Sequence, residues 1–373
     1  MNKDISNEIQ QQVMDAFQKQ MPLAIKGNET KSFYGNAIEG TLLDVSPHQG
    51  IISYEPTELV LTARSGTSLN EIESVLNENN QQLAFEPPHF SNLSNSEEAT
   101  IEATLGGTVA CGLSGPARAN YGSVRDFVLG CEIVNGKGEQ LKFGGQVMKN
   151  VAGYDVSRLM CGSLGTLGVI LNTSLKVLPK PELETSLSFE LTPNQANTTL
   201  SQWCAKPYPI TASCYHNNIL TLRLAGNAQA VKATQLKLGG EQLNNSKKFW
   251  QQLKEQQHEF FNTETNLWRI SSKPNFEHDI PNINTEVCLT EWHGALHWIK
   301  TNQNATVIQQ HAARLGGHAI LFRQNNINDN NIDIFHPLEN QIMKIHQNLK
   351  NAFDPKHILN RNKMYAFSYD ATH

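Results

Sequence analysis

Apolar and polar positions follow two different periods along this chain of 373 residues. Ile9, Val13 and Phe17 recur at four-residue spacing, which predicts an amphipathic helix close to the first residue. Between positions 171 and 177, Leu171 and Leu175 belong to a set that alternates with polar residues, as in a strand. We therefore expect a fold that mixes helices and strands.

The first part of the chain is predicted to hold short strands with a helix among them. Ser68 and Glu71 have the spacing of a capping box, and the apolar residues after them share one helical face. A hairpin is expected over 132–141, and Pro179 and Pro181 mark a domain boundary. Short apolar runs predict strands at 22–25, 41–45, 50–54 and 59–64.

After this boundary, strands are grouped with helices. Thr192 and Pro193 form a good helix start, a capping residue followed by proline at the first helical position. This grouping predicts an α+β fold in which helices cover one face of an antiparallel sheet. Strands are expected at 187–191, 220–224 and 318–323 and near 268, 288 and 298, and helices at 228–239, 247–259, 307–315 and 338–353.

The glycines are concentrated in one stretch. Positions 104–168 hold 14 of the 25 glycines, interleaved with valine, leucine, isoleucine and phenylalanine. The apolar residues argue against a flexible linker. Glycine at such density marks backbone that turns with positive φ or lies directly against another group. The stretch is therefore predicted to form ordered turns around a flat or phosphate-bearing ligand.

Composition limits the classes of function. A net charge of −5 and 39% hydrophobic residues leave no basic surplus for nucleic acid. No apolar run reaches the length of a membrane span, and the first residues lack the apolar core of a signal peptide, so we expect a cytoplasmic chain. The cysteines have no Cys-x-x-Cys spacing, which argues against disulfides, zinc and iron–sulfur ligation; they are residues 111, 131, 161, 204, 214 and 288.

The order of the glycine motifs resembles a known family. Thr104-Leu-Gly-Gly-Thr108, then Arg125–Gly130, then the hairpin and Gly162-Ser-Leu-Gly-Thr-Leu-Gly168 are similar to the FAD-binding domain of flavoproteins related to vanillyl-alcohol oxidase and p-cresol methylhydroxylase (PCMH). This resemblance covers about residues 20–180. Within the group, motifs at 86–89, 124–130, 143–159, 249–253 and 267–271 resemble the E subunits of bacterial glycolate oxidases.

The resemblance implies a two-part PCMH-type FAD-binding domain at 1–180, an α+β cap domain with an antiparallel sheet at 181–335, and a C-terminal helix and tail at 336–373 that return to the FAD domain. It places the pyrophosphate loop at Lys26–Ser32. With one glycine in seven residues, this segment by itself fits a polar turn better. The loop contains no histidine or cysteine that could tether a flavin, so non-covalent FAD is expected.

Cofactor residues are carried over from the family position by position. Gly106 and Gly107 are expected to form a turn that lets the main chain approach the ligand, while Thr104 and Thr108 donate hydroxyl hydrogen bonds. Cys111 is interpreted as a small packing residue. No catalytic residue or metal ligand is assigned. The predicted cofactor residues are Gly27, Asn28, Glu29, Thr30, Lys31, Ser32, Pro87, Thr104, Gly106, Gly107, Thr108, Gly112, Gly122, Gly168, Val169 and Ile170.

Two departures from the family affect the tail and the substrate site. Asn360 and Lys363 match the family's terminal Asn-Pro-Gly-Lys, but an arginine and an asparagine replace Pro-Gly, which leaves the contacts of Asn360 open. The histidine-rich motif of 2-hydroxy-acid flavoenzymes is reduced to Gly316-Gly-His-Ala319, so His318 is either a remnant ligand or a strand residue. Arg269 and Arg323 are candidates for binding a carboxylate.

The resemblance implies an FAD-dependent oxidoreductase, the FAD-binding subunit of a glycolate oxidase (glycolate dehydrogenase) complex that acts on glycolate or D-lactate. Its expected partners are a D-type flavoprotein and an F-type iron–sulfur subunit that takes the electrons, with peripheral contact to the inner face of the cytoplasmic membrane through the complex. The alternatives are a stand-alone FAD-dependent 2-hydroxy-acid oxidase and a non-catalytic assembly subunit. A nicotinamide enzyme is disfavoured because Leu105-Gly-Gly-Thr108 lacks the G-x-G-x-x-G pattern.

Overall fold

The computed structural model describes residues 2–91, 101–145, 155–276, 287–325 and 333–367. Part of the 143–159 motif lies outside these ranges. The described contacts divide the chain into two compact units. The first unit comprises Met1–Leu113, Ser123–Pro179 and Leu338–His373, and the second comprises Ser114–Gly122 and Lys180–Pro337.

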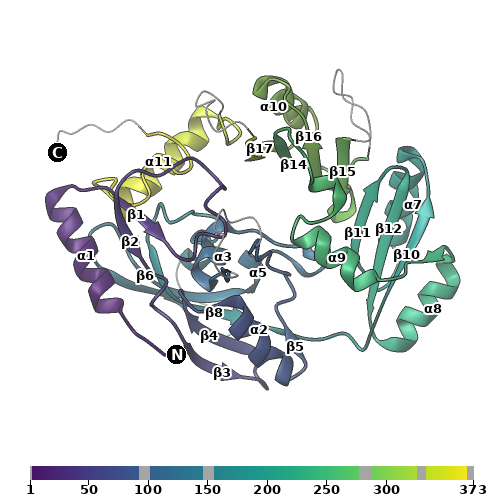
Figure 1. Ribbon diagram of the computed structural model, residues 1–373, viewed down its shortest axis with the longest axis horizontal. Helices are drawn as coiled ribbons and strands as arrows, with labels where there is room; N and C mark the ends of the chain where they lie inside the picture. Colours follow the sequence, from purple (N-terminus) through teal and green to yellow (C-terminus); the bar gives the residue numbers. More distant parts are fainter. Residues whose placement is uncertain (1, 92–100, 146–154, 277–286, 326–332, 368–373) are drawn as a thin grey trace. The chain divides into compact units, whose positions relative to one another are not determined.

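The first unit is built on a five-stranded antiparallel sheet with the order β3-β4-β8-β6-β7 (Figure 1). The predicted hairpin is its β6–β7 pair, with Ile133 opposite Leu141. A separate parallel pair joins β1 to β2, with Leu23 opposite Thr41. The bounds are β1 Leu23–Lys26, β2 Thr41–Asp44, β3 Ile51–Glu55, β4 Val60–Arg64, β5 Gln81–Gln82, β6 Val128–Val134, β7 Gln140–Gly144, β8 Val169–Lys176 and β9 Leu178–Pro179.

Helix α1 (Ser6–Lys19) packs its apolar stripe against this unit. Ile9, Val13 and Ala16 are buried in one cluster with residues of β1, β2, β6 and β8. The cluster also contains Ile358 and Leu359 from the end of the chain, so the C-terminal segment is part of the same core. The other helices of the first unit are α2 Leu69–Glu78, α3 Leu105–Cys111, α5 Val124–Phe127, α6 Val156–Leu159 and α11 Asn340–Phe353.

The second unit has an eight-stranded antiparallel sheet with the order β13-β10-β12-β11-β15-β16-β14-β17. Helix α7 starts as predicted, because Thr192 and Gln195 form a capping box. The helices and strands of the second unit are α4 Arg118–Tyr121, β10 Leu183–Glu190, α7 Pro193–Cys204, β11 Ile210–His216, β12 Ile219–Gly226, α8 Ala228–Leu238, β13 Glu241–Gln242, α9 Ser246–Lys254, η1 Glu259–Phe261, β14 Leu267–Ser271, β15 Cys288–Glu291, η3 Trp292–Gly294, β16 Leu296–Lys300, α10 Ala305–Arg314 and β17 His318–Arg323.

Three local features differ from the sequence predictions. Gly106 and Gly107 lie inside helix α3 and not in a positive-φ turn. The helix expected over 247–259 ends at Lys254, and a short η1 follows. Segment 114–122 groups with the second unit because the indole N–H of Trp292 donates to the carbonyl of Gly115 at 3.0 Å.

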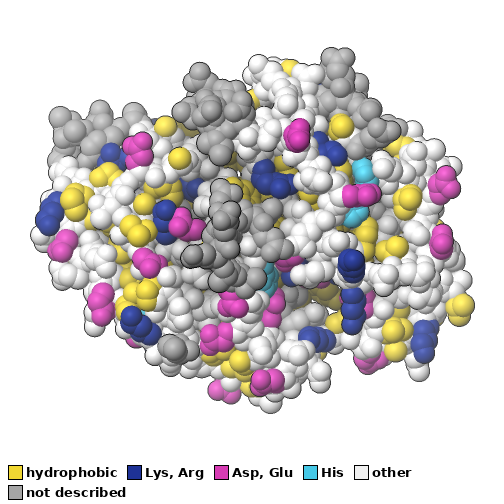
Figure 2. Space-filling model, in the orientation of Figure 1, with side chains coloured by type: hydrophobic (Ala, Val, Ile, Leu, Met, Phe, Trp, Pro, Cys, Tyr) yellow, Lys and Arg dark blue, Asp and Glu magenta, His cyan; other side chains and the backbone are white. Residues whose placement is uncertain are grey.

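The described residues bear on the sequence expectations for membrane spans and charge. Within the described ranges, no helix is both long and apolar enough to cross a bilayer. Acidic and basic side chains are interspersed over the face drawn in Figure 2. All six cysteines are free thiols.

Candidate cofactor site

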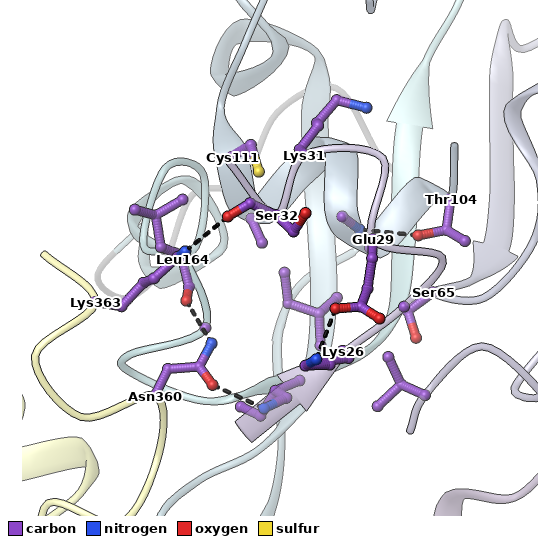
Figure 3. A pocket seen from close by; sticks show the side chains of 18 of the residues that line it. Lys26, Glu29, Lys31, Ser32, Ser65, Thr104, Cys111, Leu164, Asn360 and Lys363 are labelled. Carbon is purple, nitrogen blue, oxygen red and sulfur yellow. Dashed lines mark hydrogen bonds and ion pairs between the residues drawn. The ribbon is translucent and has the colours of Figure 1, made fainter. Parts of the chain in front are cut away.

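A cavity of about 240 Å³ lies within the first unit (Figure 3). Segments that are distant in the sequence form most of its wall. They are the end of β1 with the loop after it, the start of α3, the turn before β8, and the C-terminal segment around Asn360 and Lys363. Since these segments come from both ends and the middle of the unit, the cavity exists only in the folded chain.

The loop after β1 has the geometry of an anion-binding turn. Glu29 has a φ of 56°, and the amide of Ser32 donates to the carbonyl of Glu29 at 3.0 Å. The Lys26 ammonium contacts the Glu29 carboxylate at 2.7 Å. In the described part of the chain, the N–H groups of residues 27–30 donate no hydrogen bond within the protein. A turn that presents successive N–H groups in this way is a common phosphate-binding arrangement.

The two glycines of α3 serve different purposes. A Cβ on Gly106 would lie 2.6 Å from Cβ of Ser65, so the close packing of two backbones requires glycine there. Among the described residues, a Cβ on Gly107 would meet Oγ1 of Thr104 at 3.1 Å and no other atom within 4 Å outside its own helix backbone. The backbone therefore approaches its surroundings closely, as expected. The reason is helix packing at Gly106 and an open cavity wall at Gly107, and neither glycine has a positive φ.

The wall contains twelve of the sixteen predicted cofactor residues. Thr108 is fully buried away from the cavity, and Gly112 ends α3 with a φ of 67° against the backbone of Gly162. Pro87 does not line the cavity either, and Gly122 belongs to the second unit. The lining residues are Gly27, Asn28, Glu29, Thr30, Lys31, Ser32, Thr104, Gly106, Gly107, Gly168, Val169 and Ile170.

The C-terminal segment contributes two lining residues that were not predicted as cofactor residues. Oδ1 of Asn360 accepts from the amide of Ile25 at 2.8 Å, and its Nδ2 donates to the carbonyl of Leu164 at 2.7 Å. Asn362 stands where the family has glycine, and its φ of 60° is one that asparagine tolerates better than most residues. The altered turn therefore keeps a tight conformation, and Asn360 joins β1 to the turn before β8.

Other lining residues could be found only in the folded chain. Ser65 is buried on the wall, and its hydroxyl has no hydrogen-bond partner among the described groups. Burial raises the pKa of the Cys111 thiol, and the positive charges of Lys31 and Lys363 oppose this rise. The further residues on the wall are Ile25, Lys26, Tyr34, Ala37, Ile38, Val45, Ala110, Leu164 and Gly165.

These donors fit FAD. Its diphosphate needs N–H groups and a cation, which the loop and Lys363 offer, and its hydroxyls can pair with Ser65, whose hydroxyl has no partner among the described groups. Val169 and Ile170 supply apolar wall. A volume of about 240 Å³ is below the size of typical ligand pockets, so the described cavity accommodates a part of FAD.

In the second unit, two arginines lie close to a tryptophan ring. The guanidinium carbons of Arg118 and Arg269 lie 4.4 and 5.1 Å from the ring centre of Trp292. Burial lowers the pKa of His318, and the charge of Arg269 lowers it further. Arg323 instead donates to the carbonyl of Phe261 at 3.1 Å. Arg269 and His318 thus belong to one basic cluster, whereas Arg323 has a structural contact.

Comparison with known proteins identifies the relatives of this chain. The family model described as FAD binding domain matches residues 6–144. The chain is 44% identical over 364 residues to "Glycolate oxidase subunit GlcE" of Escherichia coli (strain K12), covering 97% of this chain and 98% of that protein. It is 31% identical over 185 residues to "Glycolate oxidase subunit GlcD" of Bacillus subtilis (strain 168), covering 49% of this chain and 37% of that protein.

A solved structure supports the fold. An alkyldihydroxyacetonephosphate synthase matches with a TM-score of 0.63 at 12% identity, over 95% of this chain and 75% of that chain. The predicted α+β PCMH-type fold class, the FAD cofactor and the family resemblance are thereby confirmed. Because the match to GlcE extends through almost the whole of both chains, this chain belongs to the GlcE family of FAD-binding glycolate oxidase subunits.

Proposed function

We propose that this chain is the FAD-binding E subunit of a glycolate oxidase complex that oxidises glycolate, and D-lactate as a second substrate, to the 2-oxo acid. The observation that carries the proposal is the 44% identity to GlcE through nearly the full length of both chains. The cavity of the first unit supports it with donors suited to FAD. Bound FAD supplies a hydride acceptor, and the protein supplies binding and orientation.

The chain's own residues have separate roles in this proposal. The loop Gly27–Ser32 binds phosphate through backbone N–H groups, and Thr104 and Ser65 contribute hydroxyls. Asn360 fixes β1 against the turn before β8, which keeps two walls of the cavity at a constant distance. The twelve predicted residues on the wall, together with Ser65, Asn360 and Lys363, form the proposed cofactor site.

FAD is held without a covalent bond in this proposal. The loop Gly27–Ser32 contains no histidine or cysteine. Of the two residue types that the loop lacks, the described wall contains one cysteine, Cys111, and burial raises the pKa of its thiol. A thiol kept protonated is a poor nucleophile, so it does not attack the cofactor. Acid precipitation of the purified chain should therefore release FAD into the supernatant, and a yellow pellet would contradict this.

Turnover is divided among subunits in this proposal. The chain retains only Gly316-Gly-His-Ala319 where 2-hydroxy-acid flavoenzymes have a histidine-rich substrate motif, and its sequence has no Cys-x-x-Cys pair. A D-type flavoprotein would supply the substrate site, and an F-type iron–sulfur subunit would take the electrons. Such a complex would bring the chain to the inner face of the cytoplasmic membrane.

The test compares glycolate oxidation by the isolated chain with that by the reconstituted three-subunit complex, using an artificial dye as acceptor. We expect turnover only in the complex, and flavin absorption bands in the isolated chain as well. Equal rates would make this chain a stand-alone oxidoreductase. A colourless isolated chain that still assembles would instead identify a non-catalytic assembly subunit.

A further inference from the structure

The C-terminal segment brings a buried lysine into the wall of the cofactor cavity. Leu359 forms a parallel bridge with Leu23, and the carbonyl of Lys363 accepts from the amide of Asn36 at 3.0 Å. These contacts place Lys363 beside the loop after β1 (Figure 3). Its side chain is almost fully buried, with 7% relative exposure of the residue.

The ammonium group of Lys363 has a donor to spare. Nζ donates to the carbonyl of Asn36 at 2.9 Å and to the carbonyl of Ser32 at 3.4 Å. An ammonium carries three N–H donors, so one is left for another acceptor. No carboxylate in the described ranges lies within ion-pair distance of it. Burial lowers the pKa of Lys363, because the charged form loses solvation by water.

The charges on the described wall do not balance. Lys26, Lys31 and Lys363 line the cavity together with Glu29, and Glu29 contacts Lys26 at 2.7 Å. Glu29 is the carboxylate among the described residues of the wall, and it lies beside Lys26, so it does not balance the charge of Lys363. The diphosphate of FAD has two phosphate groups, each with one negative charge, and would supply a counter-charge.

We infer that Lys363 binds the diphosphate of FAD, so that the C-terminal segment completes the cofactor site. This rests on the proposed function as an FAD-binding subunit. A lysine is well suited to phosphate because it acts as a compact point charge with rotatable donors. The donor that Lys363 leaves unused then gains a charged acceptor, and the buried cation gains its counter-charge.

The experiment uses Lys363→Met in the full chain. Apoprotein is titrated with FAD by flavin fluorescence and with ADP by calorimetry, because ADP carries the diphosphate without the flavin ring. We expect the variant to bind both ligands about 10- to 100-fold more weakly, the effect of losing one hydrogen bond to a charged group. Lys363→Arg keeps the charge and should bind FAD more tightly than Lys363→Met does.

Two controls separate this role from a structural one. The ammonium of Lys356 donates to the carbonyl of Phe17 at 2.9 Å and does not line the cavity, so Lys356→Met should leave FAD affinity unchanged. Thermal unfolding of the apoprotein measures packing. Because Lys363→Met removes a buried charge that has no carboxylate partner in the described ranges, the apoprotein should be at least as stable as the unmodified chain.

The outcomes distinguish the inference from the proposed function. An unmodified chain with no affinity for FAD would contradict the proposed function. Normal FAD binding by Lys363→Met would contradict the inference alone. Weaker FAD binding with unchanged ADP binding would place Lys363 at the flavin ring and overturn the diphosphate assignment, as would a less stable apoprotein with unchanged ligand affinity.

Discussion

Two lysines near the end of the chain, Lys350 and Lys363, are both buried but differ in their partners. Nζ of Lys350 contacts the carboxylate of Asp354 at 2.7 Å and donates to the carbonyls of Thr166 and Leu359 at 2.7 and 2.8 Å. All three of its donors are used. Lys363 reaches two carbonyls and, within the described ranges, no carboxylate. Burial lowers the pKa of both groups, and for Lys350 the charge of Asp354 opposes that shift.

This difference separates a structural lysine from one that binds a ligand. The contacts of Lys350 fasten α11 to the turn before β8 and to Leu359, so its charge is satisfied within the protein. Lys363 stands on the cavity wall with a donor to spare. Burial alone would assign both lysines the same role, whereas the count of donors and counter-charges tells them apart.

The largest expected effect concerns the Lys350–Asp354 pair. Asp354→Ala should lower the free energy of unfolding by about 3–5 kcal/mol, because it leaves a buried ammonium without its counter-charge. The amides of Ile358 and Leu359 also lose their acceptor, Asp354. Urea unfolding followed by circular dichroism measures the change.

The double variant Lys350→Met/Asp354→Leu is the matched control, since it removes the charge together with its partner. It should recover much of the lost stability. If the double variant is as unstable as Asp354→Ala, the carboxylate acts through the two amides and the comparison of the two lysines fails.

The sequence predicts what depends on near neighbours. The N-caps at Ser68 and Thr192 and the β6–β7 hairpin involve residues a few positions apart, and all three are present. The Gly106–Gly107 pair was predicted to be a turn because the same residue type permits both a positive φ and a close helix packing. Which of the two applies depends on the position of Ser65 in the folded chain, and the local sequence does not predict that position.

The remaining part of the site depends on distant pairs. The bond between Ile25 and Asn360 joins residues 335 positions apart, and the bond between Asn360 and Leu164 spans 196 positions. Local periodicity carries no information about such contacts. The family motif identified Asn360 and Lys363 as matching positions, but only the folded chain shows that they face the loop after β1.

An intermediate effect is expected at Gly106 and Gly107. Like the two lysines, they differ in role: Gly106 packs against Ser65 within the protein, and Gly107 lies open to the cavity. Gly106→Ala should lower the free energy of unfolding by about 1–3 kcal/mol, because its Cβ would lie 2.6 Å from Cβ of Ser65.

Gly107→Val should keep the fold and lose most bound FAD, because its side chain would enter the cavity beside Thr104. Flavin absorbance per chain and thermal unfolding measure the two effects. Normal flavin content in Gly107→Val would show that this wall does not contact the cofactor.

The smallest effect is expected for the exposed pair Lys26–Glu29, whose side chains are 40% and 48% exposed. Solvent screens such a pair, so Glu29→Gln should change the free energy of unfolding by less than about 1 kcal/mol. It also removes the one negative charge among the described ionisable groups of the wall and leaves Lys26 without this carboxylate. FAD affinity should therefore rise about two- to fivefold at low salt and return towards that of the unmodified chain at high salt, since exposed charges are screened. Fluorescence titration at both salt concentrations measures this. If affinity instead falls, the Lys26–Glu29 contact shapes the phosphate loop, and the exposed pair is then as structural as Lys350 and Asp354.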